Sequence, residues 1–361
     1  MANKLDSVLE KAQKSLGLDI RSAREQCVDE RVLLESPSLN YVFGSGFVLG
    51  RAYLLSGPFS QGKTSICTYI CSQMQKLFPN KKIVYLDMEY ALDLDHCEEL
   101  GLNIDPEHFI LLRPKCAEDL FNLIVDLSQT GEVSLFVLDS LTSLESKAQN
   151  EDAFVGFGGS KGAAVISSGM KRIIPFLYNS KASLLMVAQE RQNLSGGGLY
   201  GPDFTIASGG RAPLYYSSWN ARITKTDEIT GPNKELIGLS LRIRDTKNKL
   251  GTPKRDANVK LYFKGGIDSE EEYVDYLKVL GLVEQKGAYY SNSEWVADDG
   301  TVGMKVCGME KLKEYLKENP KLYSSIKTKV NGLIAGHSVL DDQKIEAVDE
   351  KEAALWAQLE G

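Results

Sequence analysis

The chain has 361 residues, of which 43% are hydrophobic and 25% charged, and its formal net charge is −7. This length allows one large α/β core with one or two small additions, and with no apolar run near the roughly 18 residues of a membrane span and no secretory signal we expect a soluble, cytoplasmic protein. The six cysteines contain no C-x-x-C pair and the three histidines lie far from zinc-ligand spacing, which excludes the common zinc-binding patterns.

An amphipathic segment opens the chain. Within residues 3–17, apolar side chains recur at nearly helical spacing: Leu5, Val8, Leu9, Ala12 and Leu16. The spacing predicts a helix whose apolar face docks on another surface, such as a neighbouring subunit. We therefore assign residues 1–34 to an N-terminal oligomerisation segment.

Apolar runs with strand character then alternate with helical segments. The expected strands are Ala52–Ser56, Ile83–Asp87, Val133–Asp139, Ser183–Gln189 and Leu239–Ile243. The expected helices are Thr64–Leu77, Cys116–Ser128 and Ala163–Tyr178. This alternation predicts an α/β fold, a mostly parallel sheet flanked by helices, whose ligands bind at the carboxyl ends of the strands.

Two glycine-rich stretches, Asn150–Ser160 and Glu190–Pro213, show neither helical nor strand periodicity. Loops of that length inside a compact domain are normally functional or disordered. Past Gly265–Gly266 the pattern changes to short helices and small strands. We therefore expect a core over residues 35–267 and a small α+β C-terminal domain over residues 268–337.

Charge is distributed unevenly toward the C-terminus. Residues 301–330 contain seven lysines against three glutamates, whereas residues 341–361 contain seven acids against two lysines, a net −5. The first 340 residues together therefore carry only −2. A basic patch before an acidic tail (residues 338–361) is compatible with nucleic-acid binding, although a lysine-rich, solvated helix face explains the lysines equally well.

The segment Gly57–Thr64, GPFSQGKT, matches the pattern G-x-x-x-x-G-K-[ST] between an expected strand and an expected helix. Backbone N–H groups of such a loop point at phosphate oxygens, and the following helix adds its positive end. Lys63 would reach the β- and γ-phosphates and the Thr64 hydroxyl would ligate Mg²⁺. The segment predicts a nucleoside triphosphate site with contacts from Gly57, Ser60, Gln61, Gly62, Lys63, Thr64 and Ser65.

Two further acids are needed for hydrolysis, one to anchor Mg²⁺ and one to orient or deprotonate water. Asp139 ends the strand Val133–Asp139 and is our choice as anchor, although Asp87 ends a comparable strand. Glu89 lies two residues beyond that second strand and is our candidate for activating water. From the residues alone, Asp87 and Glu145 compete with Glu89, and a solvated surface acid remains an alternative.

At residues 85–93, YLDMEYALD, the sequence resembles the RecA family of bacterial and phage recombinases, whose catalytic glutamate lies in a D-x-E-x-A-L-D run. The likeness extends from about residue 35 to residue 335, with a looser match in the N-terminal helix. It implies ATP and Mg²⁺ as cofactors, Glu89 as the residue that activates water, and Asp139 as the Walker B acid. It further implies that Asp93 contacts adenine and that His96 occupies the place of a tyrosine that stacks on adenine.

The resemblance also implies roles for residues after the third strand. Gln189, in the run MVAQER, matches a glutamine that senses the γ-phosphate. Lys247 and Lys249 match two lysines that reach across the subunit interface to the neighbour's γ-phosphate, where two cations would neutralise developing charge. Without the resemblance, an exposed basic turn before Pro253 would be the preferred interpretation.

The two glycine-rich stretches correspond to the family's two DNA-binding loops. The first, Glu151–Ser160, departs from the family pattern, and we assign no base contacts there. The second, from Gln189 to Arg211, is about three residues longer than usual. The resemblance implies sequence-independent phosphate contacts there and on the preceding helix, and base stacking by an aromatic residue that could equally be packed. These residues are Ser167, Lys171, Arg191, Gly210 and Arg211, and the aromatic one is Tyr200.

Together these features imply an ATP-dependent recombinase that forms helical filaments on single-stranded DNA and exchanges strands with homologous duplex DNA in recombination and repair. The C-terminal lysines would receive duplex DNA while the acidic tail competes for them. Single-strand-binding and mediator proteins are further expected partners, and a membrane is not. A ring-forming helicase and a mediator without hydrolysis are the alternatives, and departures at Tyr90 and His96 indicate a divergent member of bacterial or phage origin.

Overall fold

A computed structural model describes residues 8, 11, 14, 15, 29–148, 159–192, 204–206 and 211–339. The chain divides into two compact units, residues 1–31 and residues 32–361. Residues 8, 11, 14 and 15 have helical backbone, and the remainder of the predicted N-terminal helix lies outside the described residues. The second unit contains the large sheet and the helices that pack on it.

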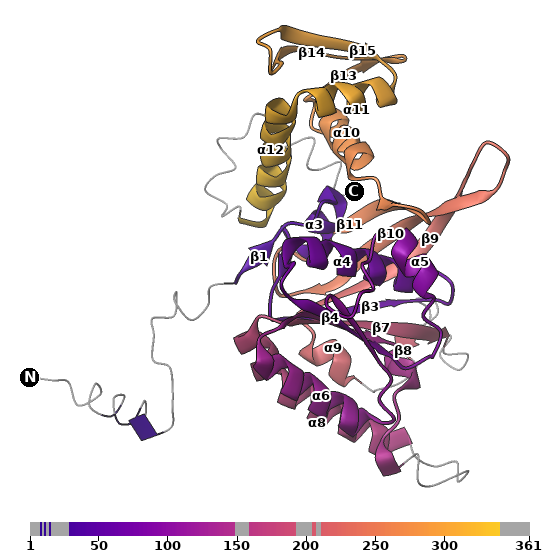
Figure 1. Cartoon of the computed structure of the whole chain (residues 1–361), viewed down its shortest axis with the longest axis vertical. Helices are drawn as coiled ribbons and strands as arrows, with labels where there is room; N and C mark the ends of the chain where they lie inside the picture. Colours follow the sequence, from indigo (N-terminus) through magenta and orange to yellow (C-terminus); the bar gives the residue numbers. More distant parts are fainter. Residues whose placement is uncertain are drawn as a thin grey trace, which may run out of the picture. The chain divides into compact units, whose positions relative to one another are not determined.

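Ten strands of the described chain form one sheet (Figure 1). They are β3 (Ala52–Gly57), β4 (Lys82–Asp87), β5 (Phe109–Leu112), β6 (Val133–Asp139), β7 (Ser183–Gln192), β8 (Phe204–Ile206), β9 (Trp219–Thr230), β10 (Leu236–Asn248), β11 (Asp256–Tyr262) and β12 (Gly266–Ile267). Their order is β12-β11-β10-β9-β3-β7-β6-β4-β5, and β8 pairs with β7. The strands from β9 to β5 are parallel, whereas β10, β11 and β12 continue the sheet antiparallel.

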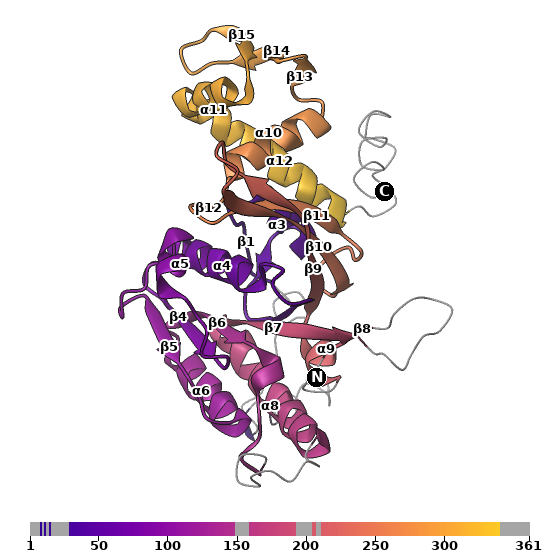
Figure 2. The ribbon, with the colours of Figure 1, turned by 90° about the vertical axis from the view of Figure 1, so that its right-hand side faces the viewer.

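Helices cover both faces of this sheet (Figure 2). They are α3 (Pro37–Phe43), α4 (Lys63–Leu77), α5 (Leu94–Glu99), α6 (Ala117–Thr130), α8 (Gly159–Ser180) and α9 (Ala212–Tyr216), with a 3₁₀ turn η1 at Leu141–Ser143 and short strands β1 (Arg31–Val32) and β2 (Phe47–Val48). Side chains of one strand alternate between the faces. On β3, Tyr53 and Leu55 belong to the buried cluster that includes α4, whereas Ala52 and Leu54 belong to the cluster that includes α6 and α8.

A smaller α+β part follows the large sheet and forms the upper part of Figure 1. It comprises α10 (Ser269–Val279), the antiparallel strands β13 (Glu284–Lys286), β14 (Tyr289–Val296) and β15 (Val302–Cys307), and the helices α11 (Met309–Glu318) and α12 (Pro320–Val339). The Ser36 hydroxyl, at the N-cap of α3, donates to Glu272 Oε2 on α10 at 2.6 Å. One buried cluster extends from α4 through α10 to α12, so this part packs directly on the core.

Several lysines of the expected basic patch have partners within the chain. Lys313 is 8% exposed and its Nζ lies 2.7 Å from Asp268 Oδ2. Lys317 forms an ion pair with Glu270 at 3.0 Å, and Lys327 Nζ lies 4.2 Å from the ring centroid of Tyr323. Lys313 therefore joins α11 to the N-cap of α10 and is withdrawn from the surface, whereas Lys317, whose side chain is 61% exposed, remains on the surface with an acidic partner.

The predicted fold class is confirmed, because a mostly parallel sheet flanked by helices forms the core. One prediction needs correction: Glu190–Pro213 is not a continuous loop. Residues 190–192 continue β7 and pair antiparallel with residues 204–206, and α9 begins at residue 212. Paired main-chain groups there replace the solvated backbone that glycine-rich composition had indicated, and the glycine positions 196–198, 201, 209 and 210 lie outside the described residues.

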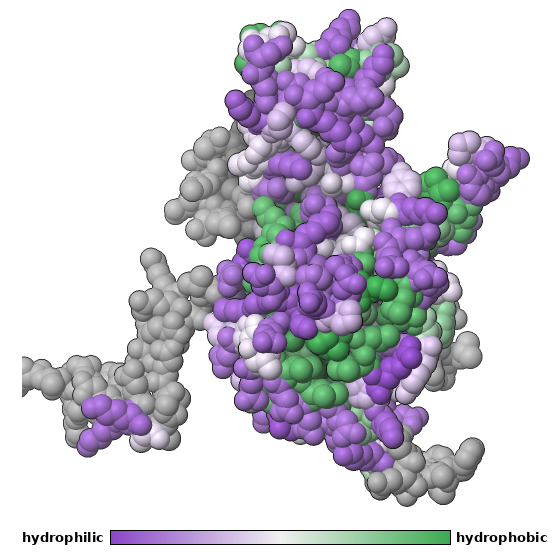
Figure 3. All heavy atoms as spheres, viewed as in Figure 1, coloured by the Kyte–Doolittle hydropathy of each residue, from purple (hydrophilic) through white to green (hydrophobic). Residues whose placement is uncertain are grey.

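Among the residues that the structure describes, no helix is both long and apolar enough to cross a bilayer. Figure 3 shows that polar residues dominate the visible surface of the α+β part. Apolar residues instead gather over the part of the core where Figure 1 labels β4 and β7.

Candidate functional site

A hollow of about 350 Å³ opens at the carboxyl ends of the central parallel strands. Parallel pairing brings these ends together, since Gly57 is in register with Gln189 and Asp87 with Asp139. The predicted residues Ser60, Gln61, Gly62, Lys63, Thr64, Ser65, Glu89, Asp139 and Gln189 all line the hollow, together with Phe59 and Val187. Residues from four separate parts of the sequence therefore meet at the edge that the parallel-sheet rule indicates.

The loop before α4 has the geometry of a phosphate cradle. A Cβ at Gly57 would lie 2.4 Å from the carbonyl oxygen of Ile223, so only glycine fits there. Gly62 has a φ of 73°, in the left-handed region, and is the N-cap of α4. Lys63 is 7% exposed, and its ammonium donates to the carbonyl oxygens of Gly57, at 3.1 Å, and Pro58. Burial lowers the pKa of Lys63, while the charges of Asp139 and Glu89 raise it.

Two oxygen ligands of the kind that Mg²⁺ prefers lie side by side at the base of the hollow. Thr64 Oγ1 donates to Asp139 Oδ2 at 2.8 Å, and the Tyr85 hydroxyl donates to the same oxygen at 2.9 Å. Burial raises the pKa of Asp139, and these two hydrogen bonds oppose that shift. A hydroxyl and a carboxylate so placed match the donor set of a magnesium–nucleotide site, so the residues fit the ion.

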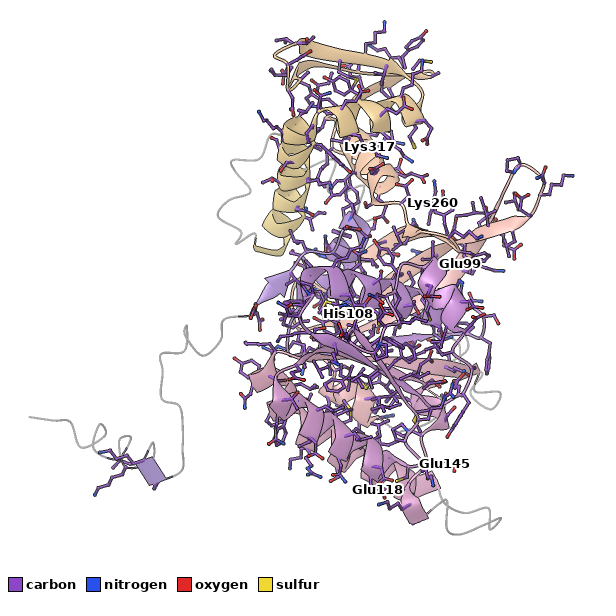
Figure 4. All side chains as sticks on the ribbon, in the orientation of Figure 1. Glu99, His108, Glu118, Glu145, Lys260 and Lys317 are labelled. Carbon is purple, nitrogen blue, oxygen red and sulfur yellow. The ribbon has the colours of Figure 1, made fainter. Side chains whose placement is uncertain are left out.

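Glu89 faces the same hollow from the turn after β4. Its Oε1 accepts hydrogen bonds from Gln189 Nε2, at 2.8 Å, and from the Ser140 hydroxyl. The competing candidate Glu145 is exposed and does not line the hollow. Figure 4 shows it near Glu118, at the start of α6. Of these two glutamates, only Glu89 lies where it could act on water beside the phosphate loop.

Asp87, the other competitor, has a different role in the fold. It is 2% exposed and accepts from Arg113 Nε at 3.2 Å and Nη2 at 3.0 Å. Its Oδ1 also accepts from the amide of Ala91 at 3.3 Å, and the Arg113 guanidinium lies 5.1 Å from the ring centroid of Tyr90. Asp87 therefore fixes the turn that carries Glu89.

Of the two candidates for adenine contact, His96 lies beside the hollow and Asp93 caps the helix that carries it. Asp93 Oδ1 accepts from the amide of His96 at 3.2 Å and so caps α5. His96 Nε2 lies 3.2 Å from Ser65 Oγ, which lines the hollow, and the His96 ring meets Phe263 edge-on at 6.1 Å. The imidazole is thus adjacent to the phosphate loop, while Asp93 is exposed and acts as a helix cap.

Comparison with known proteins decides the family. The family model described as "RecA N-terminal domain" matches residues 4–268. The chain belongs to the RecA family. It is 30% identical to Protein RecA of Lactococcus lactis subsp. cremoris (strain MG1363) over 327 residues, 88% of this chain and 79% of that protein. It is 30% identical to Protein RecA of Thermus aquaticus over 289 residues, 79% of each chain, and 27% identical to that of Mycoplasma mobile over 348 residues, 94% of this chain and 99% of that protein. RecA family membership supports a general role in DNA recombination and repair.

The lysine pair expected from the RecA pattern lies outside the hollow of its own chain. Lys247 Nζ donates to the carbonyl oxygens of Tyr215, at 2.9 Å, Ser217, at 2.6 Å, and Leu214. Burial lowers the pKa of Lys247, and the charge of Lys249 acts in the same direction. Lys249 is exposed. Within this subunit, Lys247 therefore closes the C-terminal end of α9.

The described residues include only some of the candidate DNA contacts. Ser167 and Lys171 lie four residues apart on α8, hence on one face of the helix, and Lys171 is exposed. Arg211 is exposed at the N-cap of α9. The backbone of Arg191 belongs to β7, whereas its side chain, Tyr200 and Gly210 lie outside the described residues.

Two residues of the site escaped the sequence analysis. Tyr85 appeared as one apolar member of a buried strand, and nothing local indicates that its hydroxyl reaches Asp139. Arg113 directly follows β5, so the rule that parallel strands end at one edge could have placed it near Asp87. Both contacts join residues 26 or more positions apart, which local patterns do not encode.

Proposed function

We propose that this chain is a DNA-dependent ATPase that forms helical filaments on single-stranded DNA and exchanges strands with homologous duplex DNA. The observation that carries the proposal is the 2.8 Å hydrogen bond from Gln189 to Glu89, in the hollow that Lys63, Thr64 and Asp139 also line. Gln189 lies on β7, three residues before the end of the strand that leads into the second loop of the RecA family. A single contact would then connect the acid that activates water with the segment that holds DNA.

ATP with Mg²⁺ would supply a transferable terminal phosphoryl group. The chain's own residues would bind and orient the nucleotide and deprotonate water. The loop amides and the Lys63 ammonium would hold phosphate oxygens, because both present positive charge to the hollow. Thr64 Oγ1 and Asp139 Oδ2, which lie 2.8 Å apart, would hold the ion. Glu89 Oε1 would accept a proton from water while the Gln189 amide holds that oxygen in place.

DNA would be held without regard to sequence. Lys171 and Arg211 are exposed cations, and with Ser167, Arg191 and Gly210 they would contact phosphates, while Tyr200 would stack on a base. Because nucleotide and DNA sites would share Gln189, each ligand would favour the other, so DNA should stimulate turnover. Lys247 and Lys249 would act on the nucleotide of a neighbouring subunit.

The remaining parts would serve assembly and duplex DNA. Residues 1–34 would dock on a neighbour in the filament. The part over residues 268–337 would receive duplex DNA through exposed lysines that include Lys305, Lys311, Lys321 and Lys329. The acidic tail, residues 338–361, would compete for those cations.

The first test is steady-state ATP turnover with and without single-stranded DNA, for wild type, Glu89→Gln and the control Glu145→Gln. We expect DNA to stimulate wild type and Glu145→Gln alike, because Glu145 does not line the hollow. Glu89→Gln should bind a fluorescent ATP analogue while its turnover falls about 100-fold. Turnover that ignores single-stranded DNA would refute the proposal. Displacement of a labelled strand from homologous duplex then tests strand exchange against unwinding.

A further inference from the structure

An ion pair with a buried carboxylate ties together three neighbouring strands, near the carboxyl ends of β3 and β7 and the start of β9. Arg222 on β9 donates from Nε to both carboxylate oxygens of Glu190 on β7, at 3.2 Å and 2.9 Å. Ser56 on β3, which lies between them in the sheet, donates to Glu190 Oε1 at 3.1 Å. The side chain of Glu190 is 7% exposed and that of Arg222 is 33% exposed. The carboxylate is therefore almost enclosed and held by two partners.

This cluster lies directly behind the nucleotide hollow. Val187 and Gln189 line the hollow, whereas Ala188 belongs to the buried cluster on the face of α6 and α8. Because successive side chains of a strand point to opposite faces, Glu190 projects from the face opposite Gln189. Ser56 immediately precedes Gly57, the first residue of the phosphate loop, and Gly57 is in register with Gln189. The cluster therefore borders both the phosphate loop and Gln189, the candidate for contact with the γ-phosphate.

The charge of Glu190 also acts on the phosphate loop. Burial lowers the pKa of Lys63, and the charges of Asp139, Glu89 and Glu190 oppose that shift. A carboxylate enclosed to this degree is costly without its cationic partner, so the geometry of β7 at Glu190 depends on Arg222. Loss of the pair would therefore change the backbone that carries Gln189, whereas its effect at Lys63 would be small, because Glu190 contributes least among these charges.

Glu190 is also where the β7–β8 pairing begins. Its backbone is in register with Ile206, followed by Arg191 with Thr205 and Gln192 with Phe204. A displacement of this strand pair must pass through Glu190 before it reaches Gln189, which is the next residue on the chain. The ion pair thus lies between the strand pair and the hollow, anchored to β3 and β9.

We propose that Glu190 and Arg222 are positioning residues that transmit DNA binding on the β7–β8 strand pair to Gln189. This inference rests on the proposed function, since it concerns how single-stranded DNA stimulates ATP turnover. Neither residue touches the reacting atoms. Without the ion pair, the hollow would still bind ATP and hydrolyse it slowly. The effect of DNA bound to the β7–β8 strand pair would, however, no longer be transmitted to Gln189.

The test compares wild type, Glu190→Gln, the charge-reversed double variant Glu190→Arg/Arg222→Glu, and Asp256→Asn. The last is a matched control, because it breaks the Arg242–Asp256 pair of the same sheet, where Arg242 Nε lies 2.8 Å from Asp256 Oδ2. For each we measure turnover without DNA, turnover at saturating single-stranded DNA, and the KM for ATP. In Glu190→Gln we expect stimulated turnover to fall about tenfold, with basal turnover and KM within about twofold of wild type. The double variant should recover most of the stimulation, and Asp256→Asn should keep it.

Full stimulation in Glu190→Gln, or an equal loss of turnover with and without DNA, would overturn the inference, because the pair would then be dispensable or merely structural. If wild type itself shows no stimulation, the proposed function fails, and the inference fails with it. If the charge variants do not fold, the Ser56→Ala variant tests the inference instead, because it removes one hydrogen bond to the same carboxylate. A selective loss of stimulation in Ser56→Ala supports the coupling, and unchanged stimulation refutes it.

Discussion

Gln189 Nε2 donates a hydrogen bond to Glu89 Oε1 at 2.8 Å, although the two residues are 100 positions apart in the chain. Gln189 lies three residues before the end of β7 and Glu89 two residues beyond β4, and β6 separates these strands in the sheet. Ser140, directly after β6, donates to the same Glu89 oxygen. The candidate base is therefore held from two strands at once, and one of its two partners continues into the strand pair proposed to bind DNA.

Removal of the Gln189 amide should uncouple DNA from turnover. In Gln189→Ala, Glu89 loses one of two donors, so we expect stimulation by single-stranded DNA to fall about tenfold while nucleotide affinity changes less than about threefold. Steady-state turnover and fluorescent-nucleotide titration measure both. Gln129→Ala is the control, since Gln129 is exposed on α6 and donates to the carbonyl of Val125 on the same helix. A Gln189→Ala variant with wild-type stimulation would contradict the proposed link.

Substitution of Lys247 and of Lys249 should affect the stability of the chain differently, although both residues are proposed to act on a neighbour's phosphate. In Lys247→Met, three carbonyl oxygens at the end of α9 lose their common donor, so the free energy of unfolding should fall by about 1–3 kcal/mol. Lys249 is exposed, and Lys249→Met should change that free energy by less than about 0.5 kcal/mol. Urea denaturation measures this difference.

Turnover on single-stranded DNA should nevertheless fall about tenfold or more in both lysine variants, because each removes a cation that would face the transferred phosphate. Wild-type turnover in Lys249→Met would argue against the contact between subunits. Equal stability losses in the two variants would instead mean that the carbonyl contacts of Lys247 do not hold α9.

Glu272 should make the chain less stable as pH rises. Burial between α10 and α3 raises its pKa to about 7 from the ordinary value of 4.5, while hydrogen bonds from Ser36 and Ser38 lower it. Because the folded-state pKa is the higher one, the cost of ionising Glu272 is absent below about pH 4.5, grows through this window and is complete above about pH 7. Glu272→Gln removes the charge, and should raise the free energy of unfolding near pH 8 by up to about 3 kcal/mol.

The measurement is denaturant unfolding of wild type and Glu272→Gln at several pH values from about 5 to 8. The difference between the two should be small at the acidic end and grow with pH. Glu294→Gln, a change at an exposed position on β14, should leave the pH profile as in wild type. A Glu272→Gln variant that is destabilised equally at every pH would mean that the carboxylate, rather than its neutral form, stabilises the contact with Ser36.

Some elements could be predicted because their signals are local. The strand Val133–Asp139 was expected with the bounds that β6 has, since seven consecutive residues of that run are buried. The long strand β9 was not expected, because exposed residues such as Lys225, Asp227 and Glu228 interrupt its apolar pattern. It forms nevertheless, since its backbone pairs with β10 along its whole length and with β3 at its start.

The sequence by itself determined the phosphate loop, the parallel sheet and the acids at its carboxyl edge. Each follows from short-range pattern: glycine spacing, strand–helix alternation, and a carboxylate after an apolar run. The tertiary structure decided which partners each acid has. Asp87 is paired with Arg113, Asp139 with Thr64 and Tyr85, and Glu89 with Gln189. Such pairings, like that of Glu190 with Arg222, join strands distant in sequence, so only the order and register of the folded sheet set them.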